Sequence, residues 1–111
     1  MSYLADKVYE LLKETFPFYN VQKEKFVYYK GYKLYFDFFI NELGVFLEVQ
    51  GEQHDKFIKF FHDSSYGFRQ QKKRDRLKRD YCIDNKFKLI LINHDLDYKE
   101  LLDLVNNEFR R

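Results

Sequence analysis

The sequence predicts a single α/β domain in which helices flank a central mixed β-sheet. A chain of 111 residues has the size of one domain with one core. An aromatic and β-branched stretch in its first half is typical of an antiparallel meander, and the strand–helix–strand order that follows adds a parallel strand. Apolar residues make up 45% of the chain and charged residues 34%, a balance typical of globular proteins. We therefore expect residues 1–111 to form one domain.

The periodicity of apolar residues predicts each element in turn. The first helix is indicated by four apolar side chains at helical spacing before Pro17: Leu4, Val8, Leu11 and Leu12. Breaks at Gly31 and at the turn 41–44 divide the following aromatic segment into three strands. In chain order we expect a helix over 3–15, three strands within 26–50, a polar helix over 66–84, a buried strand over 86–92 and a helix over 98–109.

The turn 41–44 predicts a strand register that brings two acids together. If this turn closes a four-residue hairpin, Ile40 pairs with Val45, and Asp37 lies opposite Glu48. One face of the pair is then wholly apolar and consists of Phe36, Phe38, Ile40, Val45, Leu47 and Val49. The other face consists of Tyr35, Asp37, Phe39, Phe46, Glu48 and Gln50.

Two carboxylates directly across a strand pair have Cβ atoms about 5 Å apart and repel each other unless a cation or a proton joins them. Mg²⁺ binds carboxylate oxygens and retains room for water and substrate phosphate. Asp37 and Glu48 are therefore candidate ligands for Mg²⁺ or Mn²⁺. The alternative is a half-solvated sheet face that carries two ordinary surface acids.

Two further residues can complete such a site. Gly51 allows the backbone to turn at the strand end and bring His54 back toward the acids, where a histidine can move a proton or bind metal. On the polar helix, Asp75 lies in a ridge of residues spaced by three and four: Phe68, Gln71, Asp75, Lys78 and Cys82. If Phe68 and Cys82 anchor this ridge on the sheet, Asp75 faces the acids. The alternatives are a surface histidine and a ridge partly in water.

The segment from Arg69 to Arg79 carries seven basic side chains and one acid, Asp75. Phosphate is the natural partner of such a concentration of positive charge, and DNA is the expected ligand. The candidate contacts to DNA phosphates are Lys72, Lys73, Arg76, Lys78 and Arg79. A solvated helix face without a nucleic-acid ligand is the alternative.

These motifs together resemble the EDxHD endonucleases, relatives of the very-short-patch-repair (Vsr) mismatch endonuclease in the PD-(D/E)XK nuclease superfamily. The segments that carry the resemblance are YFDFFI, FLEVQGEQH, FRQQKKRDRLKRDYC and KLILI. The resemblance implies a restriction-endonuclease-like αβββαβ(α) core and a DNA endonuclease that depends on Mg²⁺ or a similar ion. It also implies a kinship with small proteins that phages often encode.

Position by position, the resemblance implies a role for each motif residue. Asp37 would be the central metal ligand, Glu48 the second acid, His54 the catalytic histidine and Asp75 the last acid of the motif. The carbonyl of Val49 would also face the metal.

The sequence departs from the superfamily pattern at two positions. Gln50 occupies the place of the usual lysine, so it is expected to support the site and the histidine to replace the lysine. The leading glutamate of the first helix falls at Asp6, with Glu10 as the alternative, and both could instead be solvated because Val8 and Leu11 claim the apolar face.

Other functions remain open at this level. The same fold could serve as a DNA-binding or assembly module without hydrolysis, or as a nuclease that acts on RNA or branched DNA. An HNH nuclease is disfavoured because the INHD segment lacks a partnering histidine motif. A lone cysteine and the lack of an apolar span predict a cytoplasmic protein without a membrane contact, which would be the host cytoplasm if a phage encodes the protein. Since so short a domain has little room for sequence recognition, a homodimer or a separate specificity protein is expected.

Overall fold

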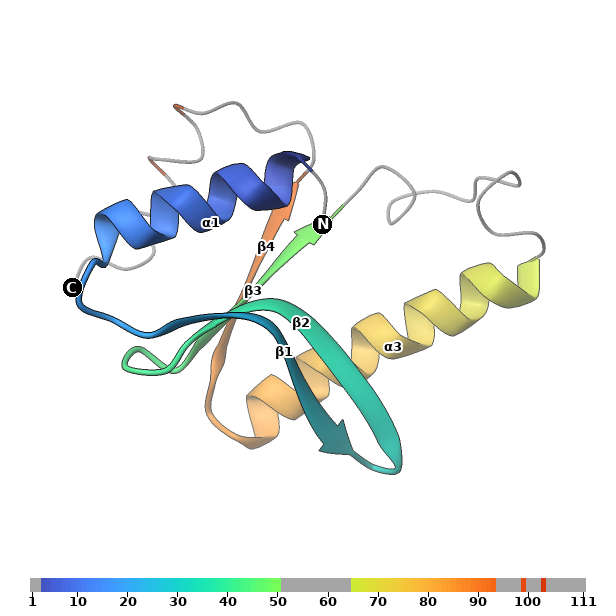
Figure 1. The fold of residues 1–111 in the computed structure, drawn as a ribbon. Helices are drawn as coiled ribbons and strands as arrows, with labels where there is room; N and C mark the ends of the chain where they lie inside the picture. Colours follow the sequence, from blue (N-terminus) through green and yellow to red (C-terminus); the bar gives the residue numbers. More distant parts are fainter. Residues whose placement is uncertain (1–2, 51–64, 94–98, 100–102, 104–111) are drawn as a thin grey trace.

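The computed structural model describes residues 3–50, 65–93, 99 and 103. Its elements are α1 (Tyr3–Thr15), β1 (Val21–Tyr29), β2 (Tyr32–Ile40), β3 (Val45–Gln50), α3 (Ser65–Asp84) and β4 (Lys88–Asn93) (Figure 1). The predicted order is confirmed as far as β4, although β1 begins earlier than expected. Of the predicted helix 98–109, only Lys99 and Asp103 are described, and both are helical. Neither α1 nor α3 has the length and apolar character of a membrane span.

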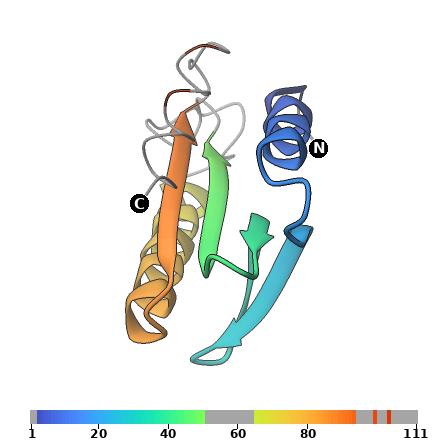
Figure 2. The same ribbon diagram turned by 90° about the vertical axis from the view of Figure 1, so that its left-hand side faces the viewer.

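The four strands form one mixed sheet in the order β1-β2-β3-β4. Strands β1, β2 and β3 are antiparallel neighbours, and β4 runs parallel to β3. Ile40 pairs with Val45 and Phe38 with Leu47, as the hairpin turn predicts. Parallel pairing of β3 and β4 requires a crossover connection, and α3 lies within it. Figure 2 shows α1 and α3 on opposite sides of the sheet.

Each face of the sheet is covered by one helix and has its own apolar core. The α1 face buries Ala5, Val8, Leu11, Leu12, Val21, Phe38, Ile40, Val45, Leu47, Ile90 and Ile92. The α3 face buries Leu34, Phe36, Phe39, Phe46 and Cys82. Burial on both faces explains why β3 and β4 are nearly continuous apolar runs.

The prediction that Phe36 and Phe38 share one apolar face of β2 is wrong. This ring lies in the α3 core, with its centroid 4.3 Å from that of Phe46, whereas Phe38 lies in the α1 core. The β1–β2 ladder is continuous except at Glu24 and Asp37, which are missing from the paired positions, and Glu24 has a left-handed φ of 53°. The hairpin turns away from β3 at this level (Figure 1). The usual alternation along β2 is therefore interrupted, and Phe36 packs toward α3 whereas Phe38 packs toward α1.

A double-mutant cycle tests this change of face. Phe36→Leu and Phe46→Leu are expected to show a coupling energy of about 0.5–1.5 kcal/mol, because their rings are in contact. Phe38→Leu and Phe46→Leu are expected to add within about 0.5 kcal/mol, since they belong to different cores. Urea denaturation of the single and double variants measures both energies. Coupling of Phe46 to Phe38 rather than to Phe36 would contradict the placement of Phe36.

Candidate functional site

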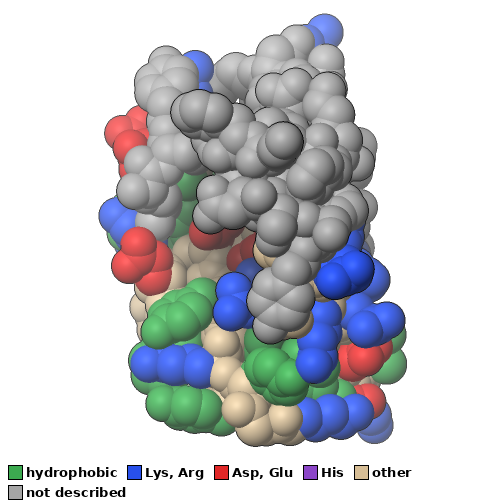
Figure 3. All heavy atoms as spheres, turned by 90° about the vertical axis from the view of Figure 1, so that its right-hand side faces the viewer, with side chains coloured by type: hydrophobic (Ala, Val, Ile, Leu, Met, Phe, Trp, Pro, Cys, Tyr) green, Lys and Arg blue, Asp and Glu red, His purple; other side chains and the backbone are tan. Residues whose placement is uncertain are grey.

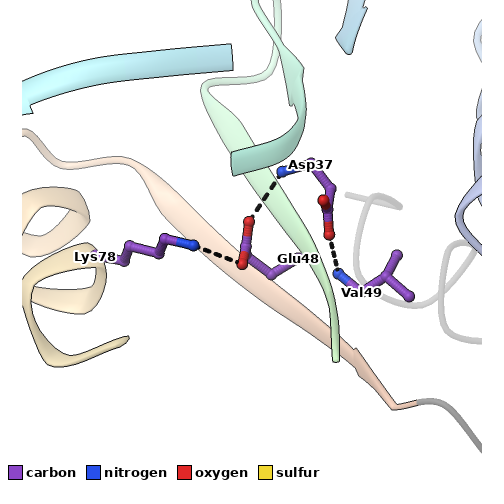
Figure 4. Close-up of polar contacts among 4 residues, drawn as sticks. All are labelled: Asp37, Glu48, Val49 and Lys78. Atoms are coloured by element: carbon purple, nitrogen blue, oxygen red, sulfur yellow. Dashed lines mark hydrogen bonds and ion pairs between the residues drawn. The ribbon is translucent and has the colours of Figure 1, made fainter. Parts of the chain in front are cut away.

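Asp37 and Glu48 meet where β2 and β3 separate. The paired positions of these strands end at Phe38 and Leu47, and side chains replace the backbone ladder beyond them. The backbone amide of Asp37 donates to Glu48 Oε1 at 2.9 Å, and the amide of Val49 donates to Asp37 Oδ2 at 2.7 Å (Figure 4). Each carboxylate thus accepts a hydrogen bond from a backbone amide beside a like charge. The two acids lie close together as predicted, but they are joined through backbone amides and are not a ladder pair of β2 and β3.

Lys78 of α3 is the third member of this cluster. Its ammonium donates to Glu48 Oε2 at 2.9 Å, and the two side chains are only 16% and 10% exposed. Figure 4 shows the lysine reaching from the helix to the strand. The sequence placed Lys78 among the DNA phosphate contacts, whereas the structure pairs its ammonium with an acid. The ridge spacing from Asp75 to Lys78 was the signal that could have identified this role.

The environment of Glu48 shifts its protonation. Burial raises the pKa of the Glu48 carboxyl above its usual value, and the charge of Asp37 raises it further. The ammonium of Lys78 and the backbone amide of Asp37 lower this pKa, but they do not cancel the effect of burial. The charge of Glu48 at a given pH therefore depends on Lys78.

Asp75 lies on the same side of the sheet as this ion pair. It is half-buried and lines a pocket of about 10 Å³, which has room for about one water molecule. The other lining residues are Glu48, Lys78, Arg79, Leu89 and Leu91. The prediction that the ridge of the polar helix carries Asp75 toward the acids is confirmed to this extent.

Asp37 also lines a larger pocket of about 410 Å³, together with Glu24, Tyr35 and Phe36. Its Oδ2 accepts the Val49 amide, and within the described ranges no hydrogen bond to its Oδ1 is found. The same ranges hold no group of three or more His, Cys, Asp or Glu side chains arranged around a common point. Two carboxylates are nevertheless sufficient for Mg²⁺, which usually keeps several waters and binds substrate phosphate.

The remaining predicted site residues are only partly brought together. His54 lies outside the described residues. Gln50 ends β3 beside Asn93, but its side chain is not among those described. Asp6 and Glu10 are exposed on α1, and no described hydrogen bond or ion pair joins them to the acid pair. The expectation that one of them supplies the leading acid therefore finds no support in the described contacts.

Helix α3 carries the basic surface. Lys72, Arg76 and Arg79 are exposed, whereas Lys73 is half-buried with its ammonium 4.8 Å from the centroid of the Tyr32 ring. Lys and Arg side chains gather along one side of the view in Figure 3. Together with Lys78, these were the predicted phosphate contacts, and three of the five, Lys72, Arg76 and Arg79, are exposed on α3.

Cys82 is buried in the α3-side core, and burial together with the charge of Glu48 raises the pKa of its thiol to about 11. Because the thiolate is the reactive form, we expect very slow reaction with iodoacetamide at pH 8 and an increase in rate as the pH approaches 11. Mass spectrometry measures the rate at this single cysteine. The urea-unfolded chain is the control and should react much faster at pH 8. Equal rates for folded and unfolded chains would contradict the burial of Cys82.

Comparisons with known proteins identify viral relatives. No family model matches the chain, and no solved structure matches it. It is 42% identical over 60 residues to uncharacterized protein 307L of Invertebrate iridescent virus 6, an alignment that covers 54% of this chain and 30% of that protein. It is 32% identical over 71 residues to uncharacterized protein 033L of Invertebrate iridescent virus 3, an alignment that covers 64% of this chain and 37% of that protein. The chain thus spans about a third of the length of these relatives.

Proposed function

We propose that this chain is a metal-dependent DNA endonuclease with a restriction-endonuclease-like core. The observation that carries the proposal is the Asp37–Glu48 pair at the opening between β2 and β3, with Lys78 held against it. Lys78 compensates the charge of Glu48, and a divalent cation bound beside Asp37 would compensate the second negative charge in the way that a nuclease requires. The element order and the basic surface of α3 agree with this function.

The residues present fit a hard divalent cation. Asp37 and Glu48 would hold it. The carbonyl of Val49 would be a further oxygen ligand, because the N–H and C=O of one strand residue point to the same side and the Val49 N–H already contacts Asp37. When bound, Mg²⁺ or Mn²⁺ would supply charge stabilisation at the scissile phosphate and lower the pKa of a water molecule.

The protein side chains would stabilise charge, transfer a proton and hold the substrate. The ammonium of Lys78 lies beside Glu48, and it would stabilise negative charge that develops on the phosphate. His54 would transfer a proton, since the neutral amide of Gln50 cannot. The exposed basic residues of α3 would hold flanking phosphates and position the strand without selecting a sequence.

Two alternative functions compete with this proposal. A DNA-binding or assembly module would use the Lys78–Glu48 pair only to stabilise the fold. Such a module has no evident use for Asp37 beside Glu48, because carboxylates repel the phosphates of its ligand. Nucleases that act on RNA or on branched DNA share the same chemistry and differ only in the substrate.

The deciding experiment is incubation of the chain with supercoiled plasmid, single-stranded DNA, a branched junction and RNA. We expect cleavage of DNA with Mg²⁺ or Mn²⁺ and none with EDTA. His54→Ala should lose this cleavage while it keeps the thermal melting temperature of the parent chain. Salt-sensitive DNA binding without cleavage of any substrate would favour the binding module. Cleavage of RNA but not of DNA would show that the substrate is RNA.

A further inference from the structure

Three aromatic side chains lie exposed on the outer face of the β1–β2 hairpin. Phe26, Tyr28 and Tyr35 are 46%, 71% and 53% exposed. Phe26 pairs with Tyr35, and Tyr28 pairs with Lys33, so these four residues form one contiguous block on one side of the two strands. We call Phe26, Tyr28, Tyr35 and Lys33 the aromatic platform.

Lys33 lies at the centre of the aromatic platform. Its ammonium is 4.4 Å from the ring centroid of Phe26, 5.3 Å from that of Tyr35 and 5.9 Å from that of Tyr28. The rings also touch one another, with centroids 5.8 Å apart for Phe26 and Tyr28 and 6.0 Å for Phe26 and Tyr35. The platform therefore combines flat apolar surface with positive charge.

The core of the protein does not account for these rings. The opposite face of the hairpin packs Val27 and Leu34 against α3, whereas nothing in the described ranges covers the platform. Leaving clustered aromatic rings in water forgoes the free energy of their burial, and such patches mark binding surfaces.

The aromatic platform is continuous with the candidate metal site. Tyr35 belongs to the platform and also lines the pocket of about 410 Å³ that contains Asp37. A chain-like ligand that lies across the platform would thus lead directly to Asp37. Figure 3 shows hydrophobic and basic side chains interleaved on this side of the molecule.

We propose that the aromatic platform binds the unpaired bases of a single-stranded DNA segment and leads its backbone to Asp37. Bases of every type can stack on aromatic side chains, and basic side chains bind the adjoining phosphates. Bases inside a duplex are stacked on each other and are not available to such a surface. The inference rests on the proposed nuclease function and narrows its substrate to DNA that contains an unpaired strand.

Charge distinguishes this ligand from an apolar protein partner. Each ring of the platform has the Lys33 ammonium within 6 Å of its centroid. A second apolar surface would bury this ammonium group without a counter-charge, which costs free energy. A phosphate of a DNA strand would instead neutralise it.

The test is binding of a fluorescently labelled oligothymidylate, followed by anisotropy in EDTA so that no cleavage is needed. Tyr28→Ala and Phe26→Ala are expected to weaken binding by about 5- to 150-fold each, and Tyr28→Trp to retain it. The matched control is Phe18→Ala, which removes an aromatic ring that is 93% exposed in the turn between α1 and β1. Its affinity should not change.

Several results would overturn the inference. These are unchanged affinity in both platform variants, equal affinity of the parent chain for single-stranded and duplex DNA, and preference for RNA of equal length and base composition. Loss of a homodimer in Tyr28→Ala, with DNA affinity retained, would instead assign the platform to a second copy of the chain. The two proposals fail separately. Platform-dependent binding without cleavage in Mg²⁺ would contradict only the nuclease, and cleavage without platform-dependent binding would contradict only this inference.

Discussion

Replacing Asp37 with asparagine is expected to reduce metal-dependent DNA cleavage by at least about a hundredfold. Asparagine has nearly the same shape, and its side-chain oxygen can still accept the amide hydrogen of Val49. The variant therefore retains the local structure and loses only the negative charge that would hold the cation. Initial rates of plasmid nicking at several Mg²⁺ concentrations measure the loss.

The control for Asp37→Asn is Glu14→Gln, which makes the same change of charge at an exposed position near the end of α1. It should cleave at the rate of the parent chain. Thermal unfolding of both variants by circular dichroism verifies that they are folded. A folded Asp37→Asn variant that cleaves as fast as Glu14→Gln would exclude Asp37 as a metal ligand.

The second large effect is expected from Lys78→Met, which keeps the apolar stem of the side chain and removes its ammonium. We expect cleavage at neutral pH to fall by about 10²- to 10³-fold, as for the loss of one preorganised electrostatic contact. Lys78→Arg should recover part of the rate, because it restores the positive charge beside Glu48. The matched control is Lys13→Met, the same substitution at an exposed position on α1, which should cleave at the rate of the parent chain.

The pH dependence separates this role of Lys78 from a merely structural one. Burial raises the pKa of Glu48 in the metal-free chain. Since the carboxylate must form before it can hold the cation, cleavage should increase with pH on the acidic side of the rate profile. Lys78 lowers this pKa, and its removal should move the acidic limb of the rate profile to higher pH. Because the folded-state pKa exceeds the unfolded one, the stability associated with protonated Glu48 is lost as the pH rises through the folded-state value, more so in Lys78→Met. An acidic limb at the same pH in Lys78→Met and the parent chain would show that Lys78 does not control the ionisation of Glu48.

The sequence by itself determined the order of the elements, the mixed sheet and the meeting of Asp37 with Glu48. Apolar periodicity distinguishes helices from strands over short segments, and the turn 41–44 determines the register of the hairpin that it closes. These are local relations, since the pairing of Ile40 with Val45 depends on residues adjacent in the chain. The ridge of α3 was likewise predictable, because helical spacing alone aligns Asp75 with Lys78.

Only the tertiary structure decided which atoms these side chains contact. The sequence alone is equally consistent with a contact between the Lys78 ammonium and a DNA phosphate. Its pairing with Glu48 depends on the position and rotation of α3 on the sheet. The departure of Phe36 from the face of Phe38 depends on the interrupted ladder at Glu24 and Asp37, which alternation along one strand does not encode. Both outcomes result from packing between distant segments, where the burial of apolar surface and the pairing of buried charge outweigh local preference.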